Sequence, residues 1–154
     1  MIISLLFSFF SYIGISSRII YFVLLLPAAV SDAKYRRIPV SLQKACVVFA
    51  AVGSFDPNPG VFLMRAAGSI FCFLFLFTIY LISHGRGVGG ADVKIISLSV
   101  LVIGFFDTAE ALLWGCSLGL FFEIVRPRLP NTKSNGIPVI TFFVAGVILN
   151  HVFS

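Results

Sequence analysis

The chain has 154 residues, of which 59% are hydrophobic, 15% aromatic and only 11% charged. A soluble domain carries about 25% charged residues, so this chain has too little charge to cover a globule in water, and we predict that most of its surface faces lipid. The formal net charge of +5 does not indicate nucleic acid, because the basic residues form short clusters between apolar runs, as in the loops of a membrane protein.

Apolar runs follow one another along the chain, and we predict one helix in each. The runs cover residues 1–31, 40–55, 61–83, 92–106, 108–125 and 137–153. A spanning helix needs about 20 mostly apolar residues, and several of these runs are shorter than that. We interpret the first run as a retained helix that ends near Asp32. The sequence therefore predicts an all-α, polytopic membrane helix bundle of about six transmembrane helices, built as one domain over residues 1–154.

The segments between the runs differ in charge on alternate sides of the membrane. Those after the second and fourth runs hold Asp56 and Asp107 and no basic residue. The segments after the first, third and fifth runs hold Lys34, Arg36, Arg37, Arg86, Arg126, Arg128 and Lys133. Positive residues stay on the cytoplasmic side, so we predict a multi-pass membrane protein with this second group in the cytoplasm and both termini outside.

The sequence offers no pattern of metal or cofactor ligands. Cys46, Cys72 and Cys116 lie singly inside apolar runs, and no CxxC pair is present. His84 and His151 stand at the ends of runs without the spacing of metal ligands. We therefore predict no metal site and no cofactor.

Two aspartates lie at the predicted cytoplasmic ends of helices. Asp32 follows the first run and Asp92 begins the fourth, 60 positions later, yet the alternation of sides places both on one membrane face. An ionisable residue at the membrane boundary is costly and is a candidate functional residue. Two carboxylates held close together share a proton, so one can take a proton from water while the other donates one. The pair predicts acid–base catalysis.

Each aspartate also has a simpler structural interpretation. Asp92 follows a glycine run and would be a good helix N-cap, and Asp32 could mark a helix end. If both are catalytic, the helix dipoles favour the shared proton on Asp32 and the negative charge on Asp92. The neighbouring basic residues Lys34, Arg36 and Arg37 act against that assignment.

Two motifs carry a resemblance to a known family. Residues 31–39, an aspartate followed by basic residues and Ile-Pro, resemble the first aspartate motif of prepilin and preflagellin peptidases, which are GxGD-type membrane aspartyl proteases. Residues 87–94, a glycine turn leading into Asp-Val-Lys, resemble the second motif. The family pattern has glycine where Ala91 stands here, and a positive φ would be disfavoured for alanine. The resemblance runs across nearly the whole chain.

The resemblance implies a single transmembrane peptidase domain in the cell inner membrane that removes the short basic leader of type IV pilin-like precursors at the cytoplasmic face. Asp32 and Asp92 would be its catalytic pair. The glycine loop would let an extended substrate approach the carboxylates, and the residues bordering the substrate would be Gly87, Gly89, Gly90, Ala91 and Lys94. Its partners would be prepilin-like precursors and the lipid bilayer.

The size of the chain indicates which members of the family it resembles most. Larger members of the family carry a cytosolic segment with paired cysteines and also methylate the new N-terminus; this sequence has no such segment, so we do not expect methyltransferase activity. The compact form is similar to the peptidases of tight-adherence (Flp-type) pilus systems. The sequence leaves the oligomeric state open.

Two other classes of function fit the same aspartates. A small ion-coupled transporter would use Asp32 and Asp92 to bind protons or cations. A non-catalytic assembly factor of a membrane machine would use neither. Cleavage of a precursor protein separates the enzyme from both.

Overall fold

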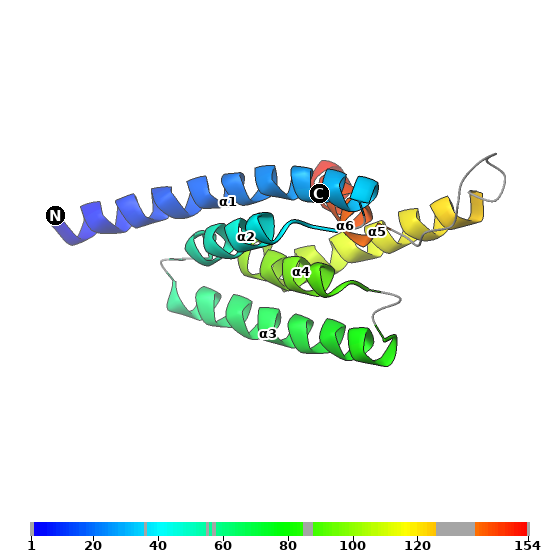
Figure 1. The fold of residues 1–154 in the computed structure, drawn as a ribbon. Coiled ribbons are helices and arrows are strands. Elements are labelled where there is room, and N and C mark those ends of the chain that lie inside the picture. Colours follow the sequence, from blue (N-terminus) through cyan, green and yellow to red (C-terminus); the bar gives the residue numbers. More distant parts are fainter. Residues whose placement is uncertain are drawn as a thin grey trace.

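The computed structural model describes residues 2–35, 37–54, 56, 58–84, 88–125 and 138–153. Over these residues it contains helices and no strand (Figure 1). The helices are α1 (Ile2–Tyr35), α2 (Val40–Gly53), α3 (Pro59–Ile82), α4 (Gly90–Ile103), α5 (Phe105–Val125) and α6 (Val139–Phe153). Each helix overlaps one predicted apolar run, and the expectation of an all-α membrane bundle is confirmed.

Helix α4 forms the centre of the bundle. It contacts α2, α3, α5 and α6, and Figure 1 shows it between α2 and α3. Apolar residues occupy every side of α4, as expected of a helix that is enclosed by others. Its buried residues are Asp92, Val93, Ile95, Ile96, Ser97, Ser99, Val100 and Val102. With 14 residues it is about 21 Å long, shorter than a bilayer core, and its neighbours supply the surface that faces lipid.

Helices α3 and α5 are the two that are long and apolar enough to cross a membrane among the described residues. In α3 the buried side chains are Cys72 and Leu76, whereas Phe71, Leu74 and Phe75 are exposed. An apolar helix with so little of its surface buried would be insoluble in water. This exposed surface therefore agrees with the prediction that lipid is the solvent.

Helix α1 runs without a break from Ile2 to Tyr35, so it ends three residues beyond Asp32. Its N-terminal part extends past the other helices in Figure 1. The Tyr21 hydroxyl ties α1 to the central helix, because it donates to the Ile95 carbonyl at 3.0 Å and lies 2.9 Å from the Ser99 hydroxyl. All three residues belong to the buried interior.

Helices α5 and α6 pack closely through small residues. A Cβ added at Gly115 would lie 2.8 Å from the Phe142 carbonyl oxygen, and one added at Gly146 would collide with the Ala111 carbonyl oxygen. Glycine at both positions lets the two backbones meet directly, which is a common way for helices to associate in membranes.

The fourth and fifth helices meet differently from the sequence prediction, which placed Asp107 between them. The junction is the single residue Gly104, and Asp107 lies in the first turn of α5. Gly104 has φ of +105°, a conformation that glycine adopts without a steric penalty. One residue is therefore enough to change the chain direction, and the carbonyl of Gly104 accepts from the Thr108 hydroxyl at 2.7 Å.

Candidate active site

Asp92 lies in the first turn of α4, at its N-terminal end, and is 8% exposed. Gly89 is the N-cap of the helix, and its backbone N–H donates to Asp92 Oδ2 at 2.9 Å. This is the bond from a side chain in the first turn back to the cap residue. The capping interpretation of Asp92 was therefore right about its neighbourhood, but Asp92 is the third residue of the helix and not the cap itself.

The glycine loop ends earlier than predicted, because Gly90 and Ala91 already belong to α4. Ala91 has a helical backbone, and His84 is the one non-glycine residue with positive φ in the described part of the chain. Alanine is consequently unstrained at position 91. The tight position is Gly89, where an added Cβ would lie 3.0 Å from Asp92 Oδ2.

Asp32 lies in the last turn of α1 and is 7% exposed. Its Oδ2 accepts a hydrogen bond from the backbone N–H of Ile140 at 3.1 Å. Ile140 is the second residue of α6, where backbone N–H groups have no partner inside the helix. Nearby, the Thr141 hydroxyl donates to the Ala29 carbonyl at 2.9 Å, so that the N-terminus of α6 is fixed against the C-terminal end of α1.

The C-terminal end of α1, which carries Asp32, and the N-terminal end of α4, which carries Asp92, lie at the same end of the bundle (Figure 1). Asp32 contributes to the electrostatic surroundings of the Asp92 carboxyl. They come from α1 and α4, and both helices pack against α2 and α6. Two buried carboxyl groups therefore lie at one end of the bundle, and like charges that are held close together disfavour ionisation of both at once.

The remaining residues predicted to border the substrate are exposed or lie outside the described residues. Lys94 lies in α4 and is exposed, and Gly90 is exposed with open space beside it, since an added Cβ would lie 4.0 Å from the Tyr80 ring. Gly87 lies outside the described residues.

The contribution of α6 to the site was missed by the sequence prediction. The signal was present, because the alternation of sides puts the start of the last run on the same face as Asp32, and Pro138 is a typical residue at the start of a helix. The dipole argument changes as a result. Asp32 lies at the C-terminal end of α1 and also accepts from the N-terminus of α6, so the dipole of α6 opposes that of α1 at this carboxyl.

Comparisons with known proteins agree with these motifs. Residues 19–124 match the model of the type IV leader peptidase family, a range that contains both aspartates. A prepilin leader peptidase/N-methyltransferase of Bacillus subtilis (strain 168) is 27% identical over 138 residues, which are 88% of this chain and 54% of that protein. The chain thus spans about half the length of this curated relative. No solved structure matches the chain. Since the family model covers more than two thirds of the sequence, the chain belongs to the type IV leader peptidase family.

Proposed function

We propose that this chain is a membrane aspartyl endopeptidase that cleaves the short basic leader from type IV pilin-like precursors at the cytoplasmic face of the inner membrane. The observation that supports the proposal is that the Asp32 and Asp92 carboxyls are both buried and that Asp32 acts electrostatically on Asp92. Membership of the leader peptidase family supports the choice of substrate class.

The proposed mechanism uses the two carboxyls as one unit that holds a single proton. The ionised carboxyl takes a proton from a water molecule, whose oxygen attacks the carbonyl carbon of the scissile peptide bond. The protonated carboxyl gives its proton to the carbonyl oxygen. When the carbon–nitrogen bond breaks, the pair gives its proton to the departing amine nitrogen. One hydroxyl of the tetrahedral intermediate returns its proton to the pair as the new carboxyl group forms, so the pair again holds one proton.

The first turn of α4 supports an extended substrate path in this proposal. Gly90 is exposed and bears no side chain, so a peptide backbone can approach there closely. We propose that Gly89 instead positions the Asp92 carboxyl through its N–H group. Lys94 is exposed on the same helix, and with Gly87 and Ala91 it completes the segment assigned to the substrate.

The name of the Bacillus relative includes an N-methyltransferase activity. The geometry of Asp32 and Asp92 bears on hydrolysis and not on methyl transfer. The proposal for this chain is confined to cleavage.

Co-expression with a pilin-like precursor in a host without its own leader peptidase tests the proposal, with cleavage scored as a mobility shift. Asp32→Asn and Asp92→Asn should each abolish the shift while the protein still inserts in the membrane. Glu110→Gln, the same loss of one carboxylate at an exposed position of α5, should leave cleavage intact. Cleavage by both Asn variants would reject the dyad. Loss of an ion flux with processing unchanged would favour the transporter.

A further inference from the structure

A second site lies at the end of the bundle away from Asp32 and Asp92. It is a cavity of about 600 Å³ whose walls come from α1, α3, α4, α5 and α6. Arg18, Arg65, Asp107, Asn150 and His151 supply its polar groups, and the rest of the lining is apolar. On α1, Arg18 precedes Asp32 by 14 positions, which corresponds to about 21 Å of helix. The cavity is therefore distinct from the candidate active site.

The cationic side of this cavity consists of Arg18 and Arg65, which share one carboxylate. Asp56 Oδ2 lies 3.7 Å from Arg18 Nη2 and 3.5 Å from Arg65 Nη1. Arg18 is held in place because its Nε donates to the Gly53 carbonyl at 2.8 Å. Arg65 Nη1 is buried and donates no hydrogen bond within the described part of the chain. Two guanidinium groups with one carboxylate leave a net positive charge on this side of the cavity.

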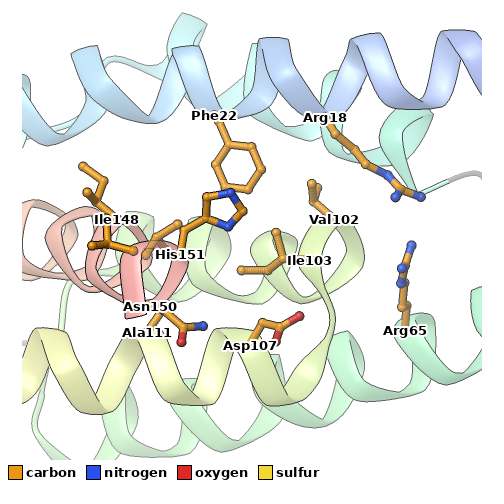
Figure 2. A pocket seen from close by; sticks show the side chains of 12 residues that line it. Arg18, Phe22, Arg65, Val102, Ile103, Asp107, Ala111, Ile148, Asn150 and His151 are labelled. Atoms are coloured by element: carbon orange, nitrogen blue, oxygen red, sulfur yellow. The ribbon is translucent and has the colours of Figure 1, made fainter. Parts of the chain in front are cut away.

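The opposite wall carries the other sign of charge. Figure 2 shows Arg18 and Arg65 extending toward each other, with Asp107 on another wall beside Asn150 and His151. Asp107 is the acidic residue of the lining, and it lies on a different element from Arg18 and Arg65, which have Asp56 between them. Such a lining complements a ligand that has an anionic and a cationic group of its own.

An apolar groove continues from the cavity along α1 and α6. Its lining shares Phe22, Val147 and Ile148 with the charged cavity, is otherwise formed by Val23, Leu25, Leu26 and Val144, and has a volume of about 260 Å³. Three of its side chains are largely open to the bundle exterior, since Val23, Leu26 and Ile148 are 58%, 52% and 53% exposed. From Arg18 to Leu26 the groove runs toward the middle of the bundle. The charged cavity therefore continues into an apolar groove that faces the lipid.

We propose that this cavity and groove bind a phospholipid with a zwitterionic headgroup, as in phosphatidylethanolamine. The phosphate accepts hydrogen bonds from Arg18 and Arg65, the ammonium group faces Asp107, and an acyl chain lies in the groove between α1 and α6. Charge-assisted hydrogen bonds from guanidinium to phosphate are among the strongest that side chains make. Burial of the acyl methylenes against Phe22, Val147 and Ile148 adds close packing that a free phosphate ion cannot have.

Native mass spectrometry of the full-length protein in detergent, titrated with phosphatidylethanolamine or phosphatidylglycerol, tests this assignment. The wild type should bind one phosphatidylethanolamine more tightly than phosphatidylglycerol. Arg65→Gln should weaken binding of both lipids about tenfold or more, because a hydrogen bond between charged groups is lost. Asp107→Asn should weaken phosphatidylethanolamine and leave phosphatidylglycerol unchanged or tighter.

Matched control variants distinguish the loss of specific lipid contacts from general effects of side-chain charge and size. Lys44→Gln removes one positive charge from an exposed position of α2, and Ile124→Trp enlarges an exposed side chain of α5. Neither should alter lipid binding, whereas Ile148→Trp should obstruct the groove and weaken both lipids. The Ile148→Trp variant leaves the ion pairs of Asp56 with Arg18 and Arg65 unchanged. It therefore tests the proposal even if Arg65→Gln fails to fold.

Three results would overturn the assignment. Lipid binding that survives both Arg65→Gln and Ile148→Trp would show that lipid binds elsewhere. Inorganic phosphate that competes as strongly as the lipid would make this an anion site without a lipid tail. Equal affinity for the two lipids, unchanged by Asp107→Asn, would remove the ammonium contact.

Discussion

At the scale of single residues, the position of the Asp92 carboxyl depends on its contact with Gly89. Gly89 donates to Asp92 Oδ2 at 2.9 Å, and its missing Cβ leaves the space that this oxygen occupies. Ala91, where the family pattern has glycine, lies in a helical turn and needs no special backbone conformation. Gly89 is therefore in direct contact with the Asp92 carboxyl, whereas Ala91 is an ordinary helical residue. The motif alone does not reveal this difference.

Gly89→Ala should lower the rate of leader cleavage by about ten- to a hundredfold, the range expected when a catalytic group is displaced by a fraction of an ångström to an ångström. Ala91→Gly should change the rate much less, because it removes only a methyl group from an unstrained helical residue. Cleavage rates of the two purified variants, measured side by side, check this. A larger loss for Ala91→Gly than for Gly89→Ala would contradict the geometry.

Sequence alone identified Asp32 and Asp92 but not their partners. The aspartates could be predicted because each is a charged residue next to a run of apolar ones. Their contacts with the Ile140 and Gly89 backbone could not, because a backbone N–H is present at nearly every residue and only the fold determines which one is unpaired. The Asp56 bridge between Arg18 and Arg65 was missed for a related reason, since its three residues lie in different elements.

At the scale of elements, the ends of the helices were predicted only to within a few residues. The third run was predicted to begin at residue 61, whereas α3 begins at Pro59, where the Asn58 side chain accepts from the Gly60 N–H at 3.0 Å. The boundary between α4 and α5 was misplaced because the charge of Asp107 was taken as the sign of a loop. The break instead occurs at Gly104, whose positive φ is a property of the backbone.

The packing of α5 against α6 leads to a prediction on stability. Gly146→Ala places a Cβ against the Ala111 carbonyl oxygen, and such overpacking typically costs about 1–3 kcal/mol. We expect a lower melting temperature in detergent for this variant. Gly90→Ala makes the same chemical change where space is open and should not lower the melting temperature. Equal melting temperatures for the two variants would show that α5 and α6 are farther apart than described.

At the scale of the whole molecule, a short enclosed helix holds one aspartate while longer helices face the lipid. The apolar runs were sufficient to predict this all-α architecture, because a membrane forces backbone groups to pair within each helix. They could not predict that α4 is central. Helix α4 resembles its neighbours in composition, and its burial follows from contacts with four other helices.

The orientation proposed for the bundle predicts which ends react with a membrane-impermeant thiol reagent. In a background where Cys46, Cys72 and Cys116 are replaced by alanine, Asn58→Cys should be labelled in intact cells. Lys34→Cys, exposed beside Asp32, should be labelled only after the inner membrane is opened, because positive residues stay on the cytoplasmic side. The reverse pattern of labelling would invert the topology.

Cleavage rates of the reconstituted protein on a pilin-like precursor test the proposed dyad most directly, compared among wild type, Asp32→Asn, Asp92→Asn and the double variant. Groups that act as one unit are strongly non-additive, so each single variant should lose about a thousandfold or more in rate, and the double variant should lose no more than either. Either single variant retaining cleavage near the wild-type rate, or losses that multiply in the double variant, would contradict the account.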